Sequence, residues 1–206
     1  VSNATGTTTI SAILGGSGNL TKTGAGTVVL SNNNTYTGAT TISAGTLSVT
    51  GSLSDSTAVS VASGATYNVG ASDTIAALTG AGNVTLNSYT LTLGNASGTY
   101  SGVMSGTGGL TVSGGSQTLS GANTYTGATT VSGGTLSLGA NDVIADSSAL
   151  TVSGGTFAVG TYSDTVGAVS LSSGSITGTT GVLTGSSYSV SNATGTTTIS
   201  AILGGS

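Results

Sequence analysis

The most constraining feature of the sequence is a segment of seventeen residues that occurs twice without a change. Residues 1–17 read VSNATGTTTISAILGGS, and residues 190–206 read the same letters. The offset of 189 residues predicts one repeat unit over residues 1–189, followed over residues 190–206 by the beginning of the next identical unit. Neighbouring copies of the same repeat are therefore the partners we expect for this chain.

Each predicted unit divides again into two diverged halves, residues 1–94 and 95–189. The stretch at 18–49, GNLTKTGAGTVVLSNNNTYTGATTISAGTLSV, aligns with GGLTVSGGSQTLSGANTYTGATTVSGGTLSL at 108–138. Equivalent residues such as Tyr36 and Tyr125 are expected on the same corner of the fold. The two seventeen-residue segments are expected at opposite ends, related mainly by translation along one axis.

Short apolar alternations predict that the chain is all-β. Segments such as 59–61, 67–69, 84–86 and 150–152 place an apolar residue at every second position, as in a strand with one buried face. Glycine-rich steps between them supply corners that need positive φ. We find no apolar stripe of helical period.

Such strands fit a β-sandwich as well as a β-solenoid. The solenoid is favoured because only 3% of the residues are charged, which is too few for an ordinary sandwich surface. Pro-free, Gly-rich corners and the recurring NTYTGATT motif also suit stacked turns. Turns of roughly 18–22 residues predict about nine or ten per unit and an axial rise of roughly 43–48 Å per unit.

The composition excludes several functions. Gly, Thr, Ser and Asn make up 125 of the 206 residues, and there is no Cys, His, Glu or Arg. Zinc and iron–sulfur sites therefore lack their usual ligands, and acid–base catalysis lacks its usual groups. One cation cannot neutralise a nucleic-acid backbone, and we find no apolar run of membrane-spanning length.

At this point the residues resemble a known family, the autotransporter-associated β-strand repeat of bacterial passenger domains and giant surface proteins. The first block of its pattern is matched by Gly18, Leu20, Lys22, Gly24, Gly26, Thr27 and Leu30, and the second by Asn34 to Gly38, Thr40, Ile42 and Gly45 to Leu47. The second half departs from it at Val112 and Ser116. The resemblance implies a right-handed parallel β-helix, an extracellular or cell-surface location, a passive extended role and no catalytic residues.

The few charged residues are better explained by structure than by chemistry. Lys22 is interpreted as a structural residue near a corner, because Val112 replaces it in the second half. Its expected partner, if it has one, is an Asp of a neighbouring turn or copy. The aspartates form no calcium-binding motif and are read as corner residues that accept backbone amides. They are Asp55, Asp73, Asp142, Asp146 and Asp164. With so few titratable groups, we expect the β structure to persist from about pH 3 to 9.

Three binding or catalytic functions remain as alternative hypotheses to a purely structural role. Tyr36 and Tyr125 could line a glycan-binding surface, although packing on a neighbouring turn is favoured. The run Thr7–Thr9 resembles ice-binding solenoids only weakly, and a paired-carboxylate glycosidase lacks a charged cleft. The sequence thus predicts a structural tandem repeat of a secreted bacterial surface fibre or filament, which assembles by continuous or end-to-end β-helix stacking. It predicts no enzyme activity and no catalytic, cofactor or metal-binding residue. An adhesin stalk whose repeats bind surface glycans or host surfaces is the alternative.

Overall fold

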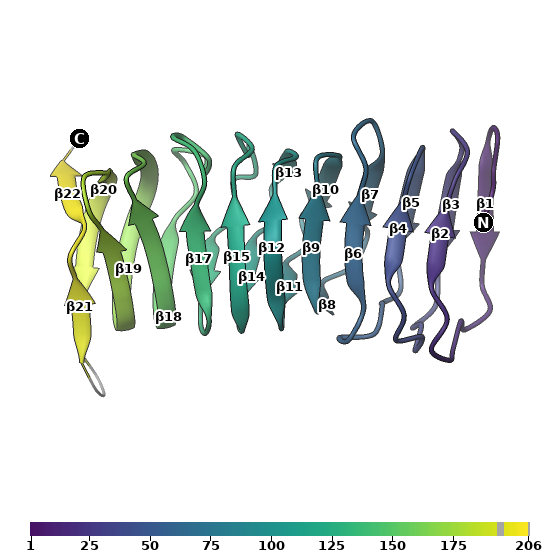
Figure 1. Ribbon diagram of the computed structural model, residues 1–206, viewed down its shortest axis with the longest axis horizontal. Coiled ribbons are helices and arrows are strands. Elements are labelled where there is room, and N and C mark those ends of the chain that lie inside the picture. Colours follow the sequence, from purple (N-terminus) through teal and green to yellow (C-terminus); the bar gives the residue numbers. More distant parts are fainter. Residues whose placement is uncertain (193–195, 206) are drawn as a thin grey trace.

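The computed structural model describes residues 1–192 and 196–205, and these residues form one elongated parallel β-solenoid (Figure 1). The described residues contain 22 strands and no helix, so no helix is available that could span a membrane. Every pairing between the described strands is parallel. The strands of successive turns stand side by side, from β1 at one end to β21 and β22 at the other.

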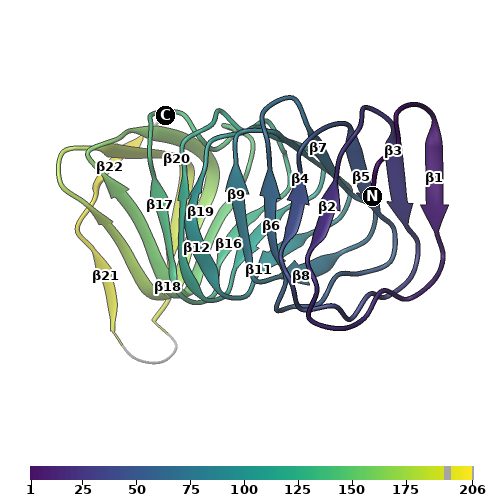
Figure 2. The ribbon, with the colours of Figure 1, turned by 45° about the vertical axis from the view of Figure 1, so that its right-hand side comes forward.

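The turns close around a common axis and present three sides (Figure 2). We call side A the six-stranded sheet and its continuation. It contains β1 (Thr7–Ile10), β3 (Thr27–Leu30), β5 (Thr46–Val49), β7 (Thr66–Val69), β10 (Asn83–Asn87) and β13 (Met104–Gly106). Side A then continues through residues 124–126 and 143–144 and the beginnings of the long strands β19 (Asp164–Gly178) and β20 (Val182–Val190), to end at β22 (Ile202–Gly205).

Sides B and C are two ranks of a sixteen-stranded sheet that long strands join around a corner. Side B contains β2 (Leu20–Lys22), β4 (Thr40–Ile42), β6 (Ala58–Val61), β9 (Ala77–Gly80), β12 (Ala96–Tyr100), β15 (Gly115–Leu119), β17 (Thr135–Leu138) and β21 (Thr197–Ile199). Side C contains β8 (Asp73–Ile75), β11 (Leu91–Leu93), β14 (Leu110–Val112) and β16 (Thr129–Val131). The strand β18 (Leu150–Gly160) and then β19 run along side C and turn onto side B.

The apolar alternation fills the space between the three sides. In β10, Val84 and Leu86 point inward and are fully buried, while the residues beside them are more exposed. The buried residues form a single apolar cluster from Val28 to Leu183, which also holds the rings of Tyr67 and Tyr100. The predicted parallel β-solenoid is confirmed, and the observed number of turns, about ten, agrees with the prediction.

The 189-residue offset between the two identical segments does not correspond to a whole number of turns. β21 repeats the last three residues of β1, but β1 lies on side A and β21 on side B. The chain returns to side A for the tenth time only at β22, one side later. The 189-residue offset therefore occupies nine turns and two of the three sides, so the expectation of a mainly translational relation is wrong.

The two halves are displaced in the same way. In the first half the motif strands β2 and β4 lie on side B, whereas their equivalents β14 and β16 lie on side C. Tyr36 precedes β4, and Tyr125 precedes β16. The prediction that these two tyrosines share a corner is therefore wrong. The reason is the number of residues per turn, which varies from 17 between Thr66 and Asn83 to 23 between Gly174 and Thr197.

Candidate functional site

Two of the buried polar residues, Asn34 and Asn123, lie where a side of the solenoid lacks a regular strand. Among the described residues, side C has no strand in its first turns, around Leu14, Asn34 and Leu53, and side A has none around Asn123 and Val143. Stacked backbones there cannot complete a regular ladder. Asparagine and aspartate side chains supply the missing hydrogen bonds.

On each of these two segments, one buried asparagine links three successive turns. The Asn34 side chain accepts from the Leu14 amide (3.1 Å) and donates to the Ser52 carbonyl (3.0 Å). Its equivalent Asn123 accepts from the Met104 amide (2.8 Å) and donates to the carbonyl of residue 143 (2.7 Å). The sequence prediction included Asn34 only as a motif match and gave neither asparagine a structural role. The signal was present, because both asparagines occupy the same place in the repeated NTYTG motif.

Asp73 and Asp164 continue these two ladders by one more turn. Asp73 Oδ2 accepts from the Leu53 amide (2.9 Å), and Oδ1 accepts from the amide of Thr74 (3.0 Å). Burial raises the pKa of the Asp73 carboxyl to about 6, although its two backbone hydrogen bonds favour the charged form. The prediction that aspartates accept backbone amides is confirmed at these two positions.

Asp164 is the more deeply buried of the two, with 2% of its surface exposed. Its Oδ2 accepts from the amides of Val143 and Ile144, both at 3.1 Å. Its Oδ1 is buried and has no hydrogen-bond partner among the described residues. Burial raises the pKa of the Asp164 carboxyl to about 7. Near neutral pH, both the protonated and the charged form of this carboxyl are therefore populated.

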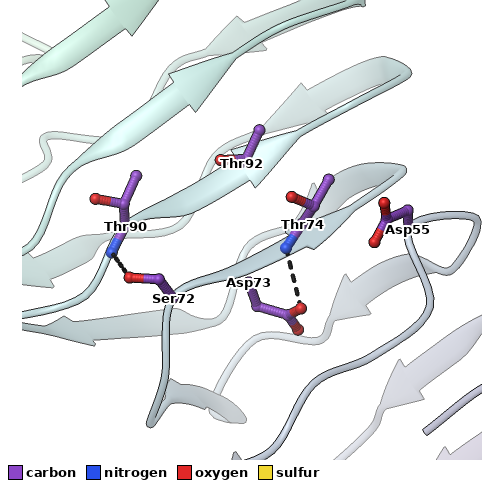
Figure 3. Close-up of a pocket in the computed structure, with 6 residues that line it drawn as sticks. All are labelled: Asp55, Ser72, Asp73, Thr74, Thr90 and Thr92. Carbon is purple, nitrogen blue, oxygen red and sulfur yellow. Dashed lines mark hydrogen bonds between the residues drawn. The ribbon is translucent and has the colours of Figure 1, made fainter. Parts of the chain in front are cut away.

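The remaining aspartates, Asp55, Asp142 and Asp146, are exposed. Asp55 and Asp73 line an open polar groove of about 330 Å³ together with Ser72, Thr74, Thr90 and Thr92 (Figure 3). Both Asp73 oxygens already accept backbone amides, which leaves Asp55 as the freer carboxylate. In the described part of the chain, no three His, Cys, Asp or Glu residues gather in a geometry that could hold a metal ion.

Lys22 is fully buried at the corner between β2 and β3. Its Nζ donates to the carbonyls of Thr23 (3.1 Å), Gly24 (2.6 Å) and Ala44 (2.9 Å). The pKa of its amino group is lowered by burial. The prediction of a corner residue is confirmed, and the partners are backbone carbonyls of two turns rather than a carboxylate.

The two motif tyrosines do not form a surface. Tyr36 and Tyr125 are buried, and their hydroxyls lie 2.6 Å from the hydroxyls of Thr40 and Thr129. A glycan-binding surface on these two rings is therefore wrong, because the rings pack in the core. The more exposed tyrosines are Tyr89 and Tyr162, with 38% and 37% of their surfaces exposed.

Comparison with known proteins places these motifs in a family. Residues 20–49 and 114–138 match the family model described as the passenger-associated-transport-repeat. The adhesin BmaC autotransporter of Brucella suis biovar 1 (strain 1330) is 35% identical over 119 residues, which cover 52% of this chain and 4% of that protein. The chain thus spans only a small part of this relative. No solved structure matches this chain. The buried Asn, Tyr and Thr residues described above lie within or beside the matched segments, and the chain carries two copies of this autotransporter passenger repeat.

Proposed function

We propose that this chain is a rigid spacer repeat in the passenger of a secreted, adhesin-type protein on a bacterial cell surface. Its role is mechanical and not enzymatic, because it holds more distal parts of the passenger away from the cell. The matched repeat and the name of the adhesin relative support the passenger and surface parts of this proposal.

The observation that carries the proposal is the packing of residues 197–205. These residues repeat 8–16, yet β21 and β22 pair directly with β19 and β20 of the preceding turn. The next copy thus begins as another turn of the same solenoid. This supports one long continuous chain, and it gives no support to end-to-end assembly of separate chains.

The surface chemistry suits a passive role outside the cell. The chain has a net charge of −4 and only six charged side chains in 206 residues. Its surface therefore has few charges that salt could screen. The one basic residue, Lys22, is buried, so a trypsin-like protease meets no accessible cleavage site in the folded chain.

The proposal is tested by changing the number of repeats in the surface protein that contains this chain. Adding or removing one 189-residue copy should move an epitope tag at the distal end by about 46 Å, from nine and two-thirds turns at ~4.8 Å. Super-resolution or electron microscopy of immunolabelled cells reads this displacement. A tag whose height does not follow the copy number would contradict the spacer role.

The second candidate is an adhesive stalk whose repeats themselves bind surface glycans, and the name of the relative favours it. The polar groove at Asp55 would be the first place to examine. Binding of the purified chain to a glycan array or to host cells, lost in Asp55→Ala, would favour this candidate. The spacer proposal predicts that the chain alone binds neither.

A further inference from the structure

The N-terminal end of the solenoid is an apolar surface without a cover. β1 pairs with β3 alone among the described strands. Beside it lies a hollow of about 280 Å³, whose lining includes Ile10, Leu14, Gly15, Leu20 and Tyr36. Ile13 and Val1 are 59% and 45% exposed. An exposed sheet edge with apolar residues is a surface on which another chain segment can stack.

The other end of the molecule shows the same residues in contact with a preceding turn. Ile199, the equivalent of Ile10, pairs with Ile176. Leu203, the equivalent of Leu14, pairs with Leu183. The hydroxyl of Tyr188 donates to the carbonyl of Gly204, which is the equivalent of Gly15.

We propose that the N-terminal end is the docking surface for the last turn of a preceding copy, in this same register. Ile176 of that copy would cover Ile10, Leu183 would cover Leu14, and the Tyr188 hydroxyl would reach the Gly15 carbonyl. This inference rests on the proposed function, since it specifies how successive spacer repeats join. The occupant of the hollow is therefore a second copy of this chain.

The register has a consequence for the whole array. Because one unit occupies nine turns and two of three sides, each copy is rotated by one side relative to the copy before it. Three copies bring every residue back to its starting side. Any exposed feature, such as the groove at Asp55, is thus presented on all three sides in succession.

A motif glycine supports the stacking independently. A Cβ added to Gly108 would lie 1.9 Å from the carbonyl oxygen of Tyr89, in the turn before it. Gly18 occupies the same motif position in the first half, but a Cβ there would meet no described atom within 4 Å. The first copy of the motif therefore keeps a glycine for which this chain alone gives no steric reason. A preceding copy in the proposed register would supply one.

The first test uses a two-copy chain, in which residues 1–189 are followed by residues 1–206. Gly18→Ala is introduced either into the first copy or into the second. The register predicts a melting temperature lowered by about 5 °C or more when the second copy carries the change, and by less than about 1 °C when the first copy does. Equal effects in the two copies would overturn the docking.

The second test reads the register with engineered disulfides at the junction of the same two-copy chain. Ser175→Cys in the first copy is combined with Thr9→Cys in the second, whose equivalent here, Thr198, pairs with Ser175. The control pair is Thr184→Cys with the same Thr9→Cys, which a repeat of ten whole turns would bring together.

We expect at least a tenfold faster cross-link for the first pair under mild oxidation, because neighbouring strands lie ~4.8 Å apart, within disulfide range. Preferential cross-linking of the control pair, or of neither pair, would overturn the register. The spacer function would still stand in that case if the distal tag follows the copy number.

Discussion

Asn123 and Asp164 bind the backbone of the same residue from opposite directions. Asn123 Nδ2 donates to the carbonyl of Val143, at 2.7 Å, and Asp164 Oδ2 accepts from its amide, at 3.1 Å. On side C, Asn34 likewise donates to the Ser52 carbonyl, and Asp73 accepts from the Leu53 amide. Where no regular strand forms, side chains from the turns on either side thus hold the backbone in place.

Stability should fall as the pH rises from about 4 to 7. Burial raises the pKa values of Asp73 and Asp164 to about 6 and about 7, whereas the unfolded values are near 3.8. The folded chain therefore binds more protons than the unfolded chain in this range, so acid favours folding. Over this pH range, the ionisation of each carboxyl should lower the free energy of unfolding by on the order of 3 kcal/mol. Urea unfolding at pH 4.5 and at pH 8 measures the difference.

The matched variants for this prediction are Asp164→Asn and Asp55→Asn. Asparagine keeps an oxygen for the amides of Val143 and Ile144 and does not titrate. Asp164→Asn should therefore flatten the pH dependence and stabilise the chain at pH 8. Asp55 is exposed, and its replacement should leave the profile nearly unchanged. A stability that instead increases from pH 4.5 to 8 would contradict the burial argument.

Asn123→Ala should destabilise the chain by about 1–3 kcal/mol. The change leaves the buried Met104 amide without its acceptor and removes one of the two donors of the Val143 carbonyl, which still accepts from the backbone amide of residue 123. Asn83, which is exposed, provides the control, and Asn83→Ala should cost less than about 0.5 kcal/mol. Thermal unfolding followed by circular dichroism compares the two. Equal losses would mean that the ladder adds nothing to stability.

Lys22→Met should lower stability by about 1–3 kcal/mol. The carbonyls of Gly24 and Ala44 lose the Lys22 donor, and the Thr23 carbonyl keeps only the Asn3 amide. The folded wild-type chain should also resist trypsin until it unfolds, since its only basic side chain is buried. Rapid cleavage after residue 22 under native conditions would show that the corner opens.

Removal of divalent cations should leave the melting temperature unchanged within about 1 °C. The described residues contain no cluster of three acidic, His or Cys side chains, and both Asp73 oxygens are occupied by amides. Melting curves with and without EDTA provide the measurement. A drop of several degrees would indicate that the groove at Asp55 holds a cation.

Much of the fold could be predicted because alternation such as Val84 and Leu86 reports burial directly. The repeat spacing and the NTYTG motif also indicated stacked turns. The displacement by one side between the identical segments β1 and β21 could not be predicted, since it depends on how many residues each corner uses, and no local pattern encodes that number. The burial of Lys22 and the raised pKa values of Asp73 and Asp164 likewise depend on neighbouring turns. Sequence alone identified these residues as corner residues but did not show that the next turn covers them.

The most direct test of the account is the length of chains with one, two and three copies. Small-angle X-ray scattering gives the maximum dimension of each. A continuous solenoid predicts an increase of about 46 Å for every added copy, from nine and two-thirds turns at ~4.8 Å. An increase well below this value, or a scattering profile of separate domains on a flexible linker, would contradict continuous stacking.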